Sequence, residues 1–197
     1  WTKDPTIPNF TTRQSIPYYN VIQNWGIVPN VSDFTDIFRD LPTFNDDISG
    51  WDVSRVQKMT RTFFNATEFN QPIGDWDVSN VFDMEDMFFN ANKFNHPLNT
   101  WVVSNVKDMD GLFTKAFTFN QPLNAWDVSS VTDMSGMFGE ASSFNQPLNT
   151  WNVSNVKDMN SMFKNASSFN QEIEAWDVTS VLDMNSMFYG ATSFNKP

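Results

Sequence analysis

Apolar residues recur at a fixed interval along most of the chain. Trp stands at six positions that are each 25 residues apart, and Phe followed by Asn stands at seven positions with the same spacing. A second Phe column and a Met column keep this interval as well. Such regularity indicates a stack of repeated units, in which each unit covers the apolar face of the next. We therefore interpret the Trp, Phe and Met columns as the core.

The repeats predict one continuous array. Residues 1–17 lie outside the pattern and are interpreted as an N-terminal arm or cap, and residues 18–197 as a single solenoid. The first unit departs from the pattern, as terminal units commonly do. The expected units are 18–43, 44–68, 69–93, 94–118, 119–143, 144–168 and 169–193, with the start of another at 194–197.

Within each unit, the apolar spacing changes halfway. Leu148, Trp151 and Val153 have the L-x-x-L-x-L spacing of a leucine-rich-repeat strand, with Pro147 at its entrance. Over residues 156–166 the apolar offsets become those of a short helix. The predicted fold class is therefore α/β: a right-handed solenoid of leucine-rich-repeat type, with a parallel sheet on one face and short helices on the other.

The repeat consensus is F-N-Q-P-L-N-x-W-D-V-S-x-V-x-D-M-x-x-M-F-x-x-A. It resembles the repeats of the BspA-like leucine-rich-repeat surface proteins, closely over residues 44–197 and loosely over residues 18–43. The resemblance implies a leucine-rich-repeat-like solenoid that is secreted or displayed on the cell surface. It also implies roles in adhesion and protein–protein binding. The chain departs from ordinary leucine-rich repeats because Trp replaces the middle Leu.

Charge and residue usage exclude several classes of function. The net charge of −11 opposes binding to nucleic acid and to anionic membranes, because both carry negative charge. No apolar run approaches the roughly 20 residues that a membrane span needs, so no membrane insertion is expected. The chain has no Cys, and its one His, His96, replaces a Gln of the repeat. With no nucleophile, base or metal cluster that breaks the repeat, we expect neither an enzyme nor a cofactor.

The residues between the inward Trp and Val of each predicted strand should face solvent. This surface is the candidate interaction face for a protein or cell-surface partner, or for copies of the chain itself. Its members are Asp52, Asp75, Asp77, Thr100, Val102, Asp127, Asn152 and Asp177.

Four of these residues are also weak candidates for a metal site. Asp52, Asp77, Asp127 and Asp177 share one column, so Asp52 and Asp77 would lie on neighbouring strands and repel each other. A cation would relieve that repulsion, but Ca²⁺ prefers six to eight oxygens from a shaped loop, and no such loop motif is present. The simpler interpretation is a solvated acidic face.

Five N-x-S/T sequons are candidate N-glycosylation sites, since this modification needs an exposed loop in a secreted protein. The alternative is chance occurrence in a chain rich in Asn and Ser. The sequons begin at Asn9, Asn30, Asn65, Asn152 and Asn165.

Three functions stay open at this point. The first is an extracellular or surface-displayed protein that mediates adhesion or protein–protein interaction. The second is a structural subunit of an extracellular filament, sheath or virion. The third is a repeat domain attached to an enzyme that lies outside this stretch.

Overall fold

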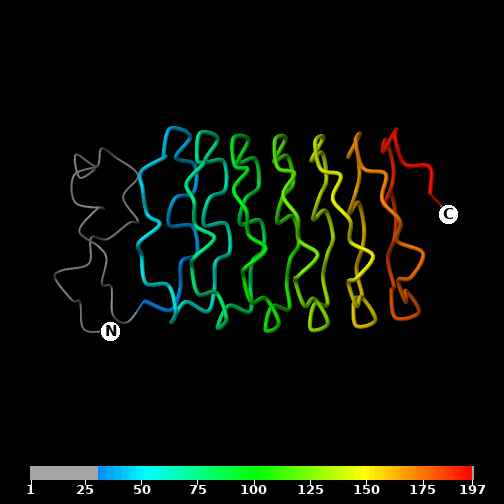
Figure 1. Cartoon of the computed structure of the whole chain (residues 1–197), viewed down its shortest axis with the longest axis horizontal. Helices are drawn as coiled ribbons and strands as arrows, with labels where there is room; N and C mark the ends of the chain where they lie inside the picture. Colours follow the sequence, from blue (N-terminus) through cyan, green and yellow to red (C-terminus); the bar gives the residue numbers. More distant parts are fainter. Residues whose placement is uncertain (1–30, 197) are drawn as a thin grey trace.

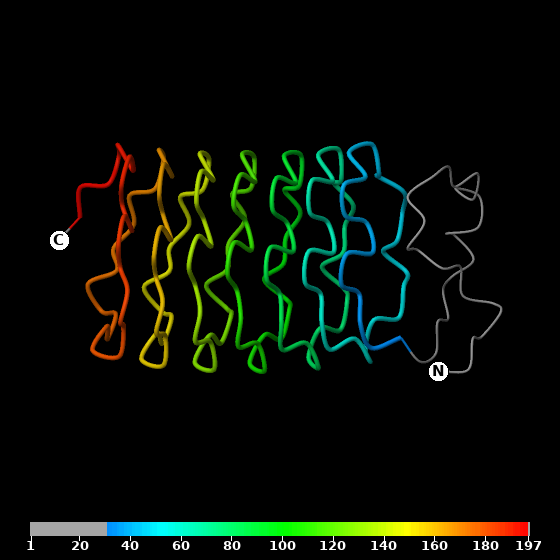
Figure 2. The ribbon, with the colours of Figure 1, turned by 180° about the vertical axis from the view of Figure 1, so that it is seen from behind.

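The structure, a computed structural model, describes residues 31–196, which form a stack of coils along one axis (Figure 1). Each 25-residue unit makes one coil, and consecutive units lie side by side in the front and rear views (Figure 2). The repeat that the sequence predicts is therefore a structural repeat. The predicted arm, 1–17, and the start of the first unit lie outside the described residues.

The core is a set of apolar columns that run along the stack. The Phe, Trp and Met columns predicted as core are buried in every inner coil, which confirms that interpretation. Rings of neighbouring coils stack on each other: the Phe113 and Phe138 centroids are 5.7 Å apart, and those of Trp126 and Trp151 are 6.4 Å apart. A single coil has no interior of its own, so burial depends on the coils before and after it.

The prediction of an α/β solenoid with a parallel sheet and short helices is wrong. Residues 31–196 contain no helix and no extended strand, only turns and six isolated parallel bridges that link Asp33, Lys58, Asp83, Asp108, Asp133, Asp158 and Asp183 in succession. No helix that could span a membrane is present in these residues. The physical reason for the missing helices and strands differs between the two sides of the coil.

On the side predicted to be helical, the backbone alternates between two kinds of hydrogen bond. In the second coil the N–H groups of residues 59, 61, 63 and 65 donate to carbonyls 24 residues later, in the next coil. The N–H groups of residues 62, 64 and 66 instead donate three residues back, within tight turns. We call residues 58–66 and their equivalents the backbone-ladder side. Every hydrogen bond that runs 24 residues forward is 2.6–3.0 Å long.

Left-handed residues make this alternation geometrically feasible. Each described coil has two residues with positive φ, four positions apart, such as Arg61 (φ 52°) and Asn65 (φ 58°). A right-handed helix cannot pass through such residues, although its apolar spacing can be retained. The predicted helix is thus a series of turns whose free N–H and C=O groups are satisfied by the neighbouring coils.

On the side predicted to be a strand, local turns replace extension. Trp151 N–H donates to Leu148 and Val156 N–H donates to Val153, which closes two turns within one unit. Between residues 69 and 81, and at equivalent positions of the described coils, no backbone-to-backbone bond joins neighbouring coils. We call this the side-chain side, because side chains join the coils there.

The Asn that follows the first Phe of each unit makes one of these joins. The Oδ1 of Asn120 accepts the backbone N–H of Asn145 at 2.9 Å, and the same bond recurs from coil to coil. The Trp of five coils, Trp76 to Trp176, makes another: the Trp126 Nε1–H, for example, donates to the Leu98 carbonyl at 2.9 Å. Neighbouring coils are therefore held in register by polar side chains that the repeat supplies at fixed positions.

Candidate interaction surface

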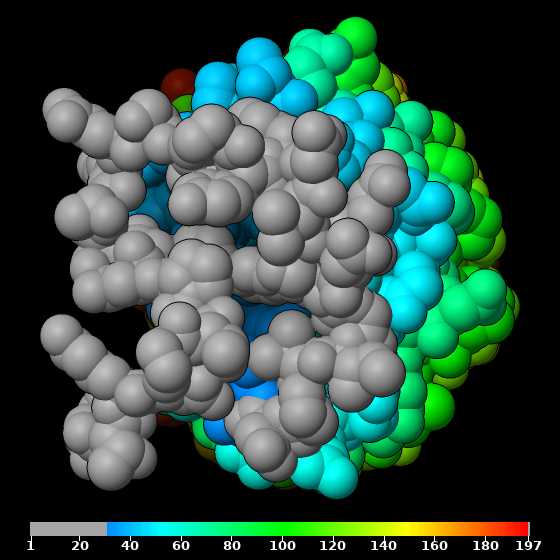
Figure 3. Space-filling view, turned by 90° about the vertical axis from the view of Figure 1, so that its left-hand side faces the viewer, coloured from blue at the N-terminus to red at the C-terminus, as the bar shows by residue number. Residues whose placement is uncertain are grey.

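All eight residues of the candidate interaction face are exposed, namely Asp52, Asp75, Asp77, Thr100, Val102, Asp127, Asn152 and Asp177. Seen from the N-terminal end, the coils lie one behind another (Figure 3), so a column of the repeat forms a continuous line along the side of the stack. The structure thus brings these residues together on one lateral surface, on the side-chain side of the coils.

The carboxylates of this surface are held by their own loops. Asp52 Oδ1 accepts the backbone N–H of Ser54 at 3.0 Å and its hydroxyl at 2.6 Å, and Asp127 accepts the backbone N–H of Ser129 at 3.0 Å. The Ser hydroxyl and then the backbone N–H lower the pKa of Asp52 and of Asp127. We call the column of Asp52, Asp77, Val102, Asp127, Asn152 and Asp177 the acidic row.

These bonds favour the local turn over a strand, although the Val102 coil makes the same turn without one. An Asp or Asn side chain that accepts an N–H two residues later offers the backbone an alternative to a sheet ladder. Asn152 Oδ1 does the same for Ser154 at 3.2 Å, so this hydrogen bond depends on the side-chain oxygen and not on the charge. Only Val102 interrupts the row, with a side chain that is 55% exposed.

The four metal candidates do not converge on one point. Each carboxylate of the row faces the Ser or Thr two residues later in its own coil. Among residues 31–196, no three His, Cys, Asp or Glu side chains are placed to hold a metal ion together. The pKa of Asp52, Asp127 and Asp177 is lowered by hydrogen bonds, so these charges are stabilised without a cation.

The structure adds an acidic cluster that sequence reasoning missed. It consists of Glu85, Asp86, Asp108 and Asp110, on the backbone-ladder side of neighbouring coils. Burial, followed by the charges of Asp110 and Glu85, raises the pKa of Asp86 to about 6. Burial also raises the pKa of Asp108 and of Asp110. Alignment of the units at 25-residue spacing places Glu85 beside Asp110, and this was the available signal.

The three sequons within the described residues differ in their surroundings. Asn65 Nδ2 donates to Asp40 Oδ1 at 2.7 Å, so its amide takes part in a contact between coils. Asn152 and Asn165 are exposed, and Asn165 lies at a left-handed position with φ of 57°. The sequons at Asn9 and Asn30 lie outside the described residues.

His96 makes the same contact as the glutamines that it replaces. Its Nε2 lies 3.0 Å from the Asn70 carbonyl, and in the next coil but one Gln146 Nε2 donates to the Asn120 carbonyl at 3.1 Å. The histidine therefore joins two coils and has no acidic or nucleophilic partner among its contacts.

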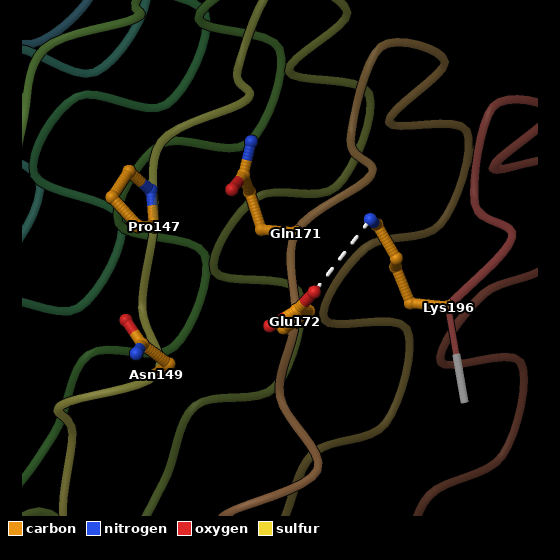
Figure 4. A pocket seen from close by; sticks show the side chains of 5 residues that line it. All are labelled: Pro147, Asn149, Gln171, Glu172 and Lys196. Carbon is orange, nitrogen blue, oxygen red and sulfur yellow. Dashed lines mark ion pairs between the residues drawn. The ribbon is translucent and has the colours of Figure 1, made fainter.

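A shallow depression lies near the C-terminal end of the stack, lined by Pro147, Asn149, Gln171, Glu172 and Lys196 (Figure 4). It forms where Glu172 replaces the Pro that stands at this position in the four preceding units. Glu172 Oε1 and Lys196 Nζ are 3.8 Å apart. An exposed ion pair beside two amides offers no nucleophile and little apolar wall, so the depression suits neither catalysis nor a small-molecule ligand.

Comparison with protein families gives one match, in two overlapping segments. Residues 9–121 and residues 96–197 both match the family described as "Mycoplasma protein of unknown function, DUF285". Searches of curated proteins and of solved structures gave no significant match.

Proposed function

We propose that this chain, which belongs to the DUF285 repeat family, is an interaction module that binds a protein partner outside the cell through its acidic row. The observation that carries the proposal is the geometry of the row. It presents one exposed side chain per coil along a continuous lateral surface, and most of these side chains are fixed by a hydrogen bond to their own loop.

Fixed carboxylates favour binding, because little side-chain freedom is lost when a partner docks. Their charge favours a basic partner and steers its approach. Exposed Val102 in the middle of the row provides an apolar contact where the charge is interrupted. The chemistry that fits this surface is an extended or flat basic segment with one apolar side chain.

The extracellular location rests on the repeat sequence. The consensus resembles the repeats of BspA-like surface proteins, which supports secretion or surface display and a role in adhesion. Asn152 is an exposed sequon whose side chain bonds within its own coil, so a glycan there would break no contact between coils. Brief protease treatment of intact cells that produce the protein tests the location. A surface protein loses its signal at once, whereas an internal protein persists until the cells are lysed.

Binding by the acidic row is tested with a synthetic lysine-rich peptide as the probe. In the first variant, Asp52, Asp77, Asp127 and Asp177 are all changed to Asn. This keeps the Oδ1 that accepts each N–H, as Asn152 does naturally. The second variant changes the acidic cluster to amides, namely Glu85→Gln, Asp86→Asn, Asp108→Asn and Asp110→Asn. Both variants remove four charges.

If the row is the binding surface, titration calorimetry at low salt shows about a tenfold loss of affinity in the first variant and less than about threefold in the second. Equal losses in the two variants would mean that only net charge matters, and would contradict the proposal. Affinity of the native chain should fall as salt is added, because exposed charges are screened.

A further inference from the structure

The coils are spaced more widely on the side-chain side than on the backbone-ladder side. Beside the acidic row, the ring centroids of Trp101 and Trp126 are 6.4 Å apart, as are those of Trp126 and Trp151. On the backbone-ladder side, the Phe88 and Phe113 centroids are only 5.5 Å apart. The paired rings are nearly parallel, so each distance is the displacement from one coil to the next at that place. Because each Trp directly precedes a member of the row, the row presents one side chain about every 6.4 Å.

This spacing matches an extended peptide that runs along the row. Alternate side chains of a strand point the same way and lie about 6.6–6.8 Å apart. The difference from the coil spacing adds up to only about 1–2 Å from Asp52 to Asp177, which the flexible stem of a lysine absorbs. At the 5.5 Å spacing of the backbone-ladder side, the same peptide would be out of register by about one coil over this length.

The other regular conformations of a peptide do not follow the row. Side chains four residues apart on an α-helix rise by about 6.0 Å but turn by about 40°, so by the sixth coil they point away from the surface. A polyproline helix places a side chain on one side only about every 9.3 Å. The extended conformation is therefore the regular one that keeps a side chain on every coil.

The order of residues along the row specifies the partner further. Asp52, Asp77, Val102 and Asp127 follow one another on successive coils, and the Val102 side chain is 55% exposed. A basic side chain opposite Val102 would lose its ion pair, and an apolar one opposite an Asp would bury a charge without a partner.

Building on the proposed function of the row, we propose that its partner is an extended segment with basic side chains at alternate residues and one apolar side chain among them. The pattern is basic-x-basic-x-apolar-x-basic, read in one of the two chain directions. The apolar residue lies on Val102, and the basic residues lie on the carboxylates of the neighbouring coils.

The test compares synthetic peptides of identical composition with blocked ends. Two of them carry the pattern in opposite directions, Lys-Thr-Lys-Thr-Ile-Thr-Lys and its reverse. The third has the same residues in blocks, Lys-Lys-Lys-Thr-Thr-Thr-Ile. By titration calorimetry at low salt, one patterned peptide should bind the native chain about tenfold more tightly than the block peptide, because it places one side chain on each coil. Equal affinities of the three peptides would overturn the proposal.

The variant with Asp52, Asp77, Asp127 and Asp177 changed to Asn separates this outcome from failure of the proposed function. If the native chain binds the three peptides equally and the variant binds all of them weakly, the row still recognises basic partners, and only the extended geometry is refuted. If the variant binds every peptide as the native chain does, the row is not the binding surface and the proposed function fails as well.

A double-mutant cycle fixes the register. Val102→Asp gives this coil the residue that its neighbours carry, so the variant should fold as the native chain does. It should weaken binding of the favoured peptide and strengthen binding of the same peptide with Lys in place of Ile, with a coupling of about tenfold. Asn152→Asp adds the same charge to a coil beyond the pattern and should change the ratio of the two affinities by less than about twofold. Equal coupling at the two positions would contradict the assignment of the apolar residue to Val102.

Infrared spectroscopy of the favoured peptide, labelled with carbon-13 at its backbone carbonyls, reports its conformation in the complex. We expect the amide band of extended backbone. A helical band in the bound peptide would refute the proposed geometry, because helical side chains cannot follow the row.

Discussion

The two sides of each coil achieve the same stacking by different means. On the backbone-ladder side, the peptide groups themselves join the coils, so the outward residues vary freely: the left-handed position of successive coils holds Asp36, Arg61, Asp86, Gly111 and Gly136. On the side-chain side, Asn, Gln and Trp make the bonds between coils, and these residues recur with little change. Repeated Asn, Gln and Trp therefore mark the side on which side chains replace backbone bonding.

The largest effect should come from a side chain that both fills the core and joins two coils. Trp126→Ala leaves a cavity between Trp101 and Trp151 and removes the indole donor to the Leu98 carbonyl. We expect it to lower the free energy of unfolding by about 3–5 kcal/mol, measured by urea denaturation. Asp127→Ala, one residue later, should change it by less than about 0.5 kcal/mol.

Trp126→Phe separates the two parts of this loss. The Phe ring refills much of the space but leaves the Leu98 carbonyl without its donor, which should cost about 1–2 kcal/mol. Comparable losses in Trp126→Ala and Asp127→Ala would contradict the assignment of core and surface.

A smaller effect is expected at Gly111, a position of the backbone-ladder side that does depend on residue type. Gly111 has φ of 62°, and a Cβ atom there would collide with the Asp86 carboxylate. Gly111→Ala should destabilise the protein by about 2 kcal/mol, roughly half of it from the left-handed backbone. Thermal or urea unfolding measures this loss.

Two controls divide the Gly111 effect. Gly50→Ala adds a Cβ that meets no atom within 4 Å and should be nearly neutral. When Gly111→Ala is combined with Asp86→Ser, the collision is removed, and only the backbone part of about 1 kcal/mol should persist. Full additivity of the two changes would show that the contact with Asp86 is unimportant.

The Asn residues that join the coils on the side-chain side should each contribute somewhat less to the free energy of unfolding. Asn120→Ala removes the acceptor of both the Asn145 backbone N–H and the Gln146 amide, at 2.9 and 3.0 Å. We expect a loss of about 1–1.5 kcal/mol in urea denaturation. Asn120→Asp keeps the accepting oxygen and should lose less than half as much. If the two substitutions are equally harmful, the accepting oxygen is not what joins the coils.

The smallest effect should come from Asp86→Asn, which we expect to stabilise the protein by an amount that depends on pH. The Asp86 pKa is raised to about 6 in the folded protein, above its value of about 3.9 in an unfolded chain. The folded state therefore binds more protons between these values, and stability falls as pH rises from about 4 to about 6.

Asp86→Asn should remove this penalty and stabilise the protein at pH 7 by about 1 kcal/mol, a value reduced for the partial exposure of the carboxylate. At pH 4 the native and variant proteins should differ much less, since Asp86 is then largely protonated. Chemical denaturation at the two pH values makes the comparison. An equal gain at both would trace the effect to the backbone and not to the charge.

Sequence reasoning identified the buried columns and the exposed row because each is a property of one repeated position. It failed on the backbone. The offsets of Val156, Met159 and Phe163 are helical, yet the residues between them include Ser161 in the left-handed region. Local propensity does not report such a conformation, because its N–H bond is made to a residue 24 positions away. The acidic cluster was missed for the same reason, since Asp86 and Asp110 meet only in the stack.

The sequence by itself determined the 25-residue period and the inward residues. Those follow from repetition, because identical positions in identical coils must meet. Only the tertiary structure decided that the coils contain turns in place of strands and helices. Hydrogen bonds between coils exist only after stacking, and once they satisfy the peptide groups, no regular secondary structure is required.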